Sequence, residues 1–477
     1  MNRLMMAVTM TVLCYSSSSL GREVRIAEVV PIDCSRFAAA QGVDPQDKIG
    51  IGLAGIIQHQ LRYLLEWIAA NHETKSDLPE WRGIPCYYPA FSYGWEQAVR
   101  PLAHISWGLA VAVKTGIYST EITGISQTQA MVRLELAIRG AAFTHRVNTA
   151  EGMRWGDMWQ SAYWSSEVAE AAWLVWDKLS HETRLAVAKM LEHEADRFID
   201  YAVPYYADKT GKIIRPGNTA AEENAWNSRV LMAAVCMLPK HSNRGRWLNK
   251  ACQLMISSYS RPSDLNNNTT VDGKRVRDWI NGSNALEPGL VINHGRIHPD
   301  YMACVYFNCT ATLDCSLAQV PIPESAYFNL DVVYDALTSY KFTAGPSPWT
   351  KGQIQPPGGT IYRRRADGSY DPATYYPESA DWTNVSYDNI MLDLYAKLRG
   401  LDAGKSFDCL GWVRARMAEI IKLQNRPGHD GNIYEKGDWL TEYRNTDAVS
   451  FQAISEAWML WWLMRHKLVS PVASIAG

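Results

Sequence analysis

Apolar residues recur at steps of three and four along most of this chain, which is the spacing of a helix that buries one face. Alternation at every second residue, typical of strands, is scarce, so the chain is predicted to be all-α. The predicted helices are 52–70, 96–113, 129–143, 165–179, 183–203, 221–238, 245–259, 301–317, 324–340, 389–401, 412–424 and 449–466.

These helices show no repeat of fixed period, which argues against an ordinary solenoid. Very apolar segments such as 457–464 alternate loosely with amphipathic ones. An inner ring of helices buried on both sides, inside an outer ring that is half exposed, would produce this alternation. We expect an α/α toroid, an incomplete barrel of helical hairpins, that forms one domain from residue 40 to residue 470.

The N-terminus predicts export. Arg3 precedes an apolar run at 4–13, and small polar residues follow it. This pattern indicates a signal peptide over residues 1–20, and both this run and 457–464 are too short to cross a bilayer. We therefore expect a secreted or periplasmic protein that does not span a membrane. The cysteines beyond Cys14 include no CxxC pair, which argues against a structural zinc site, and their disulfide pairing cannot be deduced.

The charge balance bears on the class of partner. Lys and Arg number 47 against 49 Asp and Glu. A nucleic-acid-binding protein normally carries a basic excess, so nucleic acid is not expected as a partner. The oligomeric state is not indicated.

The densest group of chemically active residues lies in VINHGRIHPDYMACVY, residues 291–306. Proline is favoured at the first helical position, so Pro299 predicts a helix with His298 as its N-cap and Tyr301 in its first turn. There the helix dipole favours a phenolate, and nearby cations lower the pKa of a tyrosine that transfers protons. His294 and Arg296 precede it on the same segment. The alternative is a loop whose polar groups only cap the helix.

His294 and His298 also have the HxxxH spacing of a metal pair. That motif requires a continuous helix, which Gly295 and Pro299 interrupt. We therefore expect no metal site here, and nothing else in the sequence calls for a cofactor.

A second group lies in PGNTAAEENAWNSR, residues 216–229. Thr219 and Glu222 have the spacing of a capping box, which favours a structural role for Glu222. Asn224 and Asn227 are about one turn apart on either side of Trp226. Asparagine is a poor helix former, so the pair either bonds to neighbouring loops or holds a substrate group.

Aromatic residues mark a third segment, RWGDMWQSAYW at 154–164. Trp155, Trp159 and Tyr163 follow at steps of four and would share one side of a helix. Such a stripe is often core, but here polar residues are interleaved with it. That mixture suits sugars, whose C–H faces stack on rings while their hydroxyls form hydrogen bonds.

The least regular segment is 341–388, which contains Arg364 within a run of three arginines. Loops of this length are uncommon unless they have a function. It is either a surface excursion or a lid whose arginines face an acidic substrate.

These residues resemble those of toroid-type polysaccharide lyases that act on uronic-acid polymers: the alginate, glucuronan and chondroitin AC-type enzymes. The resemblance rests on ENAWN, NHGRIHPDY and the helical pattern. It implies that Asn224 or Asn227 neutralises the substrate carboxylate, with Asn224 favoured, and that Tyr301 acts with His294 or His298. Arg296 or the arginine run would supply the arginine. The spacing from His to Tyr is shorter than in the chondroitin enzymes, and no large C-terminal β domain follows.

The implied reaction is β-elimination on an acidic polysaccharide. The proton at C5 is weakly acidic while the adjoining carboxylate is charged, so amide and cationic donors must stabilise the intermediate. A base removes this proton and an acid protonates the leaving oxygen O4. Asn227, Trp155, Trp159, Tyr163, Trp226 and Arg364 would bind the sugars. Neither step requires a cofactor.

Two alternatives stay open. A glycoside hydrolase on the same scaffold would need two carboxylates about 5–9.5 Å apart; its candidates are Glu222, Glu223, Asp157 and Asp381. A non-catalytic glycan-binding protein would keep the aromatic residues and tolerate the loss of Tyr301 and both histidines.

Overall fold

The structure, a computed structural model, describes residues 28–37, 41–89, 95–150, 154–340, 362–371, 387–403, 408–428, 431–433 and 446–474. This part of the chain is mostly helical, as the apolar periodicity predicted. The predicted signal peptide lies outside the described residues. So do Asp381 and most of the predicted lid, 341–361 and 372–386.

The longer helices match the predicted segments closely in most cases. They are α1 (Lys48–Asn71), α2 (Trp95–Lys114), α4 (Gln127–Phe143), α5 (Ser161–Leu174), α6 (His181–Asp196), α7 (Ala221–Met237), α8 (Arg244–Ser258), α12 (Ala311–Ala318), α13 (Leu330–Ser339), α14 (Tyr387–Leu398), α15 (Cys409–Gln424) and α16 (Thr446–Arg465). The short ones are α3 (Thr120–Thr123), α9 (Val276–Trp279), α10 (Pro299–Ala303) and α11 (Tyr306–Cys309).

Three predicted helices are not continuous. Segment 165–179 comprises α5 and, after Val175, a 3₁₀ turn at Trp176–Lys178. Segment 301–317 comprises α10, α11 and α12, and the residues that link them, Cys304 and Thr310, keep right-handed backbone angles, so this segment bends without unwinding. Segment 324–340 begins with a 3₁₀ turn, and α13 starts only after Asn329, whose φ is 57°. Asparagine tolerates this left-handed conformation, which a continuing helix does not contain.

The strands are two or three residues long. The antiparallel pairs are β1 (Glu73–Lys75) with β2 (Cys86–Tyr88), β3 (Ala207–Asp208) with β6 (Gly282–Ser283), β4 (Thr270–Val271) with β5 (Lys274–Arg275), β7 (Ile292–Asn293) with β8 (Arg296–Ile297), and β10 (Arg363–Arg364) with β11 (Tyr370–Asp371). β9 (Ile322–Pro323) pairs in parallel with β12 (Val472–Ala473). These pairs fasten loops to one another and form no extended sheet.

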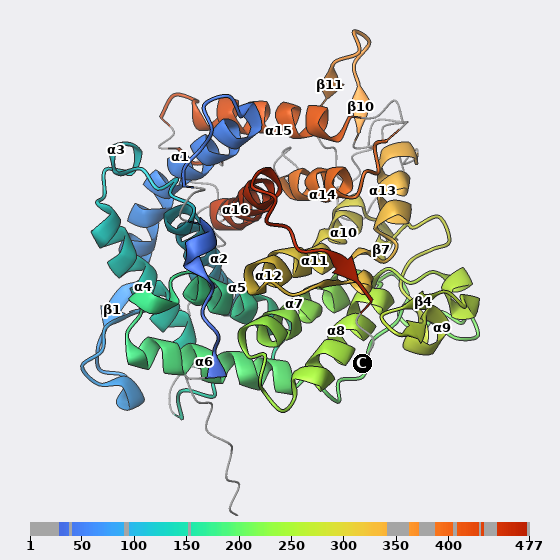
Figure 1. The fold of residues 1–477 in the computed structure, drawn as a ribbon, viewed down its shortest axis with the longest axis horizontal. Helices are drawn as coiled ribbons and strands as arrows, with labels where there is room; N and C mark the ends of the chain where they lie inside the picture. Colours follow the sequence, from blue (N-terminus) through green and yellow to red (C-terminus); the bar gives the residue numbers. More distant parts are fainter. Residues whose placement is uncertain are drawn as a thin grey trace, which may run out of the picture.

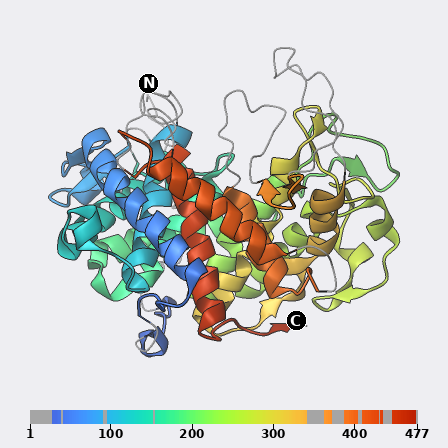
Figure 2. The same cartoon turned by 90° about the horizontal axis from the view of Figure 1, so that it is seen from above.

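The helices pack as a closed series. α2 packs against α5, α5 against α7, α7 against α11 and α12, α11 against α14, α14 against α16, and α16 against α2. α1, α4, α6, α8, α13 and α15 lie farther out (Figure 1). Near the ends of the chain, α1 lies beside α15 and α16 (Figure 2).

The helices nearest the centre are buried on every side. All residues of α5 are buried, and so are all residues of α16 from 450 to 463. The apolar run 457–464 is thus part of a core helix, as predicted. None of the described helices combines the length and the hydropathy that a bilayer crossing requires. The cysteines of the described part form no disulfide with one another.

Charged residues also lie in this core. Arg229 of α7 is 1% exposed. Its guanidinium contacts Glu456 of α16 and lies 3.5 Å from Glu170 and 3.9 Å from Glu167, both of α5. Glu167 also pairs with Nδ1 of His104 on α2, at 2.5 Å. Burial raises the pKa of Glu456 to about 7, although Arg229 acts to lower it.

We expect Glu456 to make the folded state less stable as the pH rises. Its carboxyl holds a proton up to about pH 7 in the folded state, against 4.5 in the unfolded chain. The folded state therefore binds more protons between these values, and the stabilisation present below about pH 4.5 is lost as the pH passes about 7.

Glu456→Gln keeps an acceptor for Arg229 but does not titrate. Urea denaturation should show that the free energy of unfolding falls less steeply between about pH 5 and about pH 8 in this variant than in the wild type. Equal pH slopes in the two proteins would contradict the assignment.

Candidate active site

Residues 291–298 form a β-hairpin, which the sequence analysis did not predict. β7 and β8 pair antiparallel, and the turn between them consists of His294 and Gly295. Their φ angles are 51° and 77°. Positive φ at both positions is the geometry of a type I′ turn, which matches the twist of the two strands. His294 therefore stands exposed at the tip of the hairpin.

Helix α10 follows the hairpin directly. It begins at Pro299 with His298 as the N-cap residue, as predicted. Nε2 of His294 lies 3.0 Å from the hydroxyl of Tyr301. The ring of His298 meets the ring of Tyr301 edge-on, with centroids 4.6 Å apart. The hydroxyl of Tyr259 donates to the backbone carbonyl of Tyr301 at 2.8 Å, which fixes the first turn of α10.

The hairpin is joined to the segment that precedes α7. The amide of Thr219 donates to the carbonyl of Ile292, and the amide of Gly295 donates to the carbonyl of Gly217, both at 2.8 Å. Gly217 has a φ of 77°, and a Cβ there would lie 3.3 Å from Cα of Gly295. Two glycines therefore let the two backbones touch, which brings the first turn of α7 to the back of the hairpin.

Glu222 is the main residue whose environment the sequence did not reveal. The predicted capping box is wrong: the N-cap is Ala220, and no side chain caps α7. Glu222 is 6% exposed, and its Oε1 accepts a hydrogen bond of 3.0 Å from Nδ2 of Asn293. Burial raises its pKa to about 8. It is therefore a neutral carboxylic acid at pH 7, with a proton that it can donate.

The two asparagines of α7 differ in their contacts. Nδ2 of Asn224 donates to the carbonyl of Pro204 at 3.1 Å, so one of its two N–H donors is occupied. Asn227 is 3% exposed, and Oδ1 of neither asparagine accepts a hydrogen bond from the described residues. The same holds for Oε2 of Glu222, and the indole N–H of Trp226 donates to none of them. Since buried polar groups are nearly always paired, this part of α7 is suited to a polar ligand.

The aromatic residues of 154–164 do not form a helical stripe, so that prediction is wrong. α5 begins only at Ser161, because the preceding backbone turns at Asp157, whose φ is 54°. Trp155 and Tyr163 lie in the core, where the indole donates to a backbone carbonyl and the hydroxyl to a glutamine of α16. Trp159 is 58% exposed, and its ring meets that of Trp226 edge-on, with centroids 5.5 Å apart.

The predicted arginines occupy two different places. Arg296 stands in β8, next to the hairpin turn, and its side chain is outside the described part. The guanidinium of Arg364 stacks on the ring of Tyr370 at 3.8 Å and donates to the carbonyl of Gly368. Tyr370 in turn packs on Trp412 of α15. Within the described residues, Arg364 is therefore held in its own hairpin and not at Tyr301.

A third arginine, Arg215, was not predicted. Its Nη1 lies 3.2 Å from Oε2 of Glu223, whose Oε1 accepts a hydrogen bond of 3.2 Å from Tyr201. The positive charge of Arg215 also acts to lower the pKa of Glu222, against the larger effect of burial. Arg215 lies on the loop before α7, outside every recognised motif, so sequence reasoning had no signal for it.

The described part contains no group of three or more His, Cys, Asp or Glu residues arranged to hold a metal ion. Comparisons with known protein families, with curated proteins and with solved structures found no match to this chain. The chemistry of the site is therefore inferred from its own residues.

Proposed function

We propose that this protein is a polysaccharide lyase that cleaves a uronic-acid-containing glycan by β-elimination. The observation that carries the proposal is the hydrogen bond of 3.0 Å between Nε2 of His294 and the hydroxyl of Tyr301. It joins a phenol and an imidazole at an exposed hairpin tip. The hairpin touches a helix that carries a neutral acid, Glu222, and the side-chain amide of Asn227, whose N–H groups can donate to a carboxylate. These are the groups that proton abstraction beside a carboxylate requires.

The elimination breaks two bonds and forms one double bond. The C5–H bond gives its electron pair to the new C4=C5 bond, and the C4–O4 bond breaks so that O4 leaves with its pair. Tyr301, as the phenolate, takes the C5 proton and returns it to O4 when both atoms lie on one side of the ring. His294 accepts the phenolic proton beforehand and supports the phenolate by donating to it, and His298 packs against the ring.

The substrate carboxylate must be neutralised while C5 carries negative charge. Asn227 suits this role better than Asn224, because one of the two N–H donors of Asn224 already binds the carbonyl of Pro204 and fixes the orientation of its amide. Glu222, neutral at pH 7, donates its own proton in a hydrogen bond to the carboxylate. A charge-assisted hydrogen bond of this kind is about twice as strong as a neutral one.

The packing of the helices and the residues around the site are consistent with this function. We infer that the closed series of helices is an α/α toroid and that the protein is exported, as its first residues predict. Trp159 and Trp226 would contact sugar rings beside the reacting one, and Arg215 would favour an acidic polymer.

The raised pKa of Glu222 also suits the acid of a glycoside hydrolase, which needs a second carboxylate. Glu223 is paired with Arg215 and Tyr201, and Asp157 is paired with Arg146 and His193. The described residues thus support the hydrolase less well.

The product decides between these functions. Purified protein is incubated with glucuronan, alginate, chondroitin and neutral β-glucan while absorbance in the near ultraviolet is recorded. A lyase produces a C4=C5 double bond, and the absorbance rises without consumption of water. Release of reducing ends without this absorbance would establish hydrolysis and overturn the proposal.

Tyr301→Phe should reduce turnover by about 10²–10⁴-fold, because it removes the proton-transfer group and keeps the ring. The thermal midpoint should be unchanged. Tyr118→Phe, which removes a phenol remote from this site, serves as the control and should retain full activity. A folded Tyr301→Phe protein with near-normal eliminase activity would rule out the mechanism.

Asn227→Ala should lower turnover by about 10²–10³-fold, as expected when one donor to a developing negative charge is lost. Asn224→Ala should lower the thermal midpoint more than turnover at saturating substrate, because its N–H group serves the backbone of Pro204. Turnover and thermal midpoint measured side by side test the assignment, and the reverse ranking would transfer the role to Asn224.

Ionisation of Glu222 should make activity fall as the pH rises through about 8, because the carboxylate can no longer donate a hydrogen bond. Its contribution to folding stability has the same sign: it is complete below pH 4.5, where the carboxyl of the unfolded chain is also protonated, and is lost as the pH passes about 8. Glu222→Gln cannot ionise, so kcat/KM measured against pH should lose this alkaline limb. An unchanged limb would assign it to another group.

A further inference from the structure

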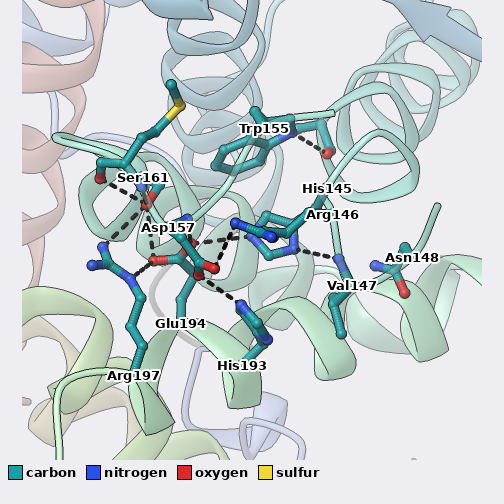
Figure 3. A network of polar contacts seen from close by, with 12 residues as sticks. His145, Arg146, Val147, Asn148, Trp155, Asp157, Ser161, His193, Glu194 and Arg197 are labelled. Carbon is teal, nitrogen blue, oxygen red and sulfur yellow. Dashed lines mark hydrogen bonds and ion pairs between the residues drawn. The ribbon is translucent and has the colours of Figure 1, made fainter. Parts of the chain in front are cut away.

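The exposed ring of Trp159 belongs to a short loop that is fixed in place from behind. This loop, 156–160, connects an isolated bridge between His145 and Trp155 to the start of α5. Although the loop is short, its backbone and side chains form hydrogen bonds with α6 and with Ser161, the first residue after the loop. Figure 3 shows these contacts from close by.

Glu194 of α6 is the centre of this arrangement. Its Oε1 accepts hydrogen bonds from the backbone amide of Asp157 at 3.0 Å and from Nε2 of His145 at 3.1 Å. Its Oε2 accepts from Oγ of Ser161 at 3.0 Å and from Nε of Arg197 at 2.6 Å. Although burial opposes it, these donors and the charge of Arg197 lower the pKa of Glu194 to about 2.

His145 completes the arrangement as a neutral ring. Burial lowers its pKa, against the raising effect of Glu194. With its proton on Nε2 it donates to Glu194, and Nδ1 then accepts from the amide of Val147. Each polar atom of the ring therefore has one partner, and the ring holds the bridge residues against α6.

The loop itself has a strained backbone. Asp157 has a φ of 54°, a left-handed conformation that is unfavourable for a residue with a Cβ. Its carboxylate is held by Nε2 of His193 at 2.7 Å and by Nη1 of Arg146 at 2.8 Å. Gly156 has a φ of 120°, and a Cβ there would lie 2.5 Å from Nε2 of His145. Strain of this kind persists only where surrounding contacts enforce it, and it is common at ligand-binding segments.

We propose that Glu194 and Asp157 are positioning residues that hold Trp159 as a rigid stacking surface for a pyranose ring of the substrate. This inference rests on the proposed function, since it assigns the neighbouring sugar of the same glycan to Trp159. The bonds to Glu194 fix the loop before and after Trp159, at Asp157 and at Ser161. The indole then stands edge-on to Trp226, on the same helix as Glu222 and Asn227.

Rigidity matters because the indole is largely exposed, so its order depends on the loop that carries it. Ordering a mobile side chain on binding costs conformational entropy, and a loop that is ordered beforehand avoids this cost. Loosening the loop should therefore weaken binding of the glycan and leave the proton transfers at Tyr301 unchanged. In kinetic data this appears as a higher KM at constant kcat.

The test uses full-length protein that carries Tyr301→Phe, so that the probe is not consumed. Binding of two tetrasaccharides is measured by calorimetry: β-1,4-linked tetraglucuronate and its neutral counterpart, cellotetraose. Three variants are compared in this background: Trp159→Ala, Asp157→Gly and the two combined. Glycine adopts the left-handed φ without strain, so Asp157→Gly removes the side-chain bonds to His193 and Arg146 and is expected to fold.

Trp159→Ala should raise Kd for both sugars about 10-fold, as expected for the loss of one aromatic contact. Asp157→Gly should raise Kd about 5-fold, and the combined variant should bind no more weakly than Trp159→Ala alone, because the two residues act through one ring. Asp157→Asn, which tolerates positive φ and keeps an acceptor, should restore most of the affinity. Asp278→Ala removes a comparable exposed ion pair with Arg275 and serves as the control.

Glu194→Gln tests whether the centre of the cluster positions the loop. KM and kcat are measured in the otherwise unchanged enzyme, and KM should rise while kcat stays constant. The inference would be overturned if the effects of Asp157→Gly and Trp159→Ala on Kd multiply, or if Asp157→Gly leaves Kd unaltered. It would also be overturned if neither sugar binds. A different outcome would contradict only the proposed function. If sugar binding depends on Trp159 but the unmodified protein shows no eliminase activity, the protein is not a lyase and the positioning role of Glu194 and Asp157 still holds.

Discussion

The buried charge of Arg229 is the constraint on which the arrangement of the helices depends. Its guanidinium lies where α5, α7 and α16 meet, against carboxylates of the other two helices. An uncompensated charge there would cost about 3–5 kcal/mol, so the three helices are held in the one register that surrounds it with carboxylates. Glu222, Trp226 and Arg229 follow at steps of four and three residues and share one face of α7. Anchoring Arg229 therefore also sets the direction of Glu222 and Trp226.

Two buried glutamates show how the same side chain is adapted to different tasks. Glu194 accepts four hydrogen bonds, two of them from Arg197 and a backbone amide, and its pKa falls to about 2. Glu222 accepts one hydrogen bond, from Asn293, and its pKa rises to about 8. Both are buried, so the hydrogen-bond donors and the neighbouring positive charge decide which form is stable. The ionised one fixes a loop permanently, whereas the neutral one keeps a proton available to a ligand.

Sequence reasoning predicted the helices well because a buried face repeats at the helical period whatever its partners are. It also predicted the N-terminus of α10, since Pro299 and His298 are local signals. It failed where distant contacts decide: Thr219 and Glu222 have capping-box spacing, yet contact with the hairpin buries Glu222. The hairpin itself was missed because His294–Gly295 lacks the Asn or Asp that usually marks such a turn. The steps of four between Trp155, Trp159 and Tyr163 would place them on one side of a helix, and nothing in this spacing reveals the left-handed turn at Asp157.

Two non-glycine residues with positive φ, His294 and Asp157, lie beside the candidate site. His294 and Asp157 both adopt this conformation, one at the tip of the hairpin and the other before Trp159. The hairpin touches the first turn of α7, and Trp159 meets Trp226 further along the same helix. Each conformation costs free energy that glycine would avoid, yet glycine would carry neither an imidazole toward Tyr301 nor a carboxylate to clamp a loop. At these two positions a side chain is needed where the backbone disfavours it, and both positions adjoin the same helix.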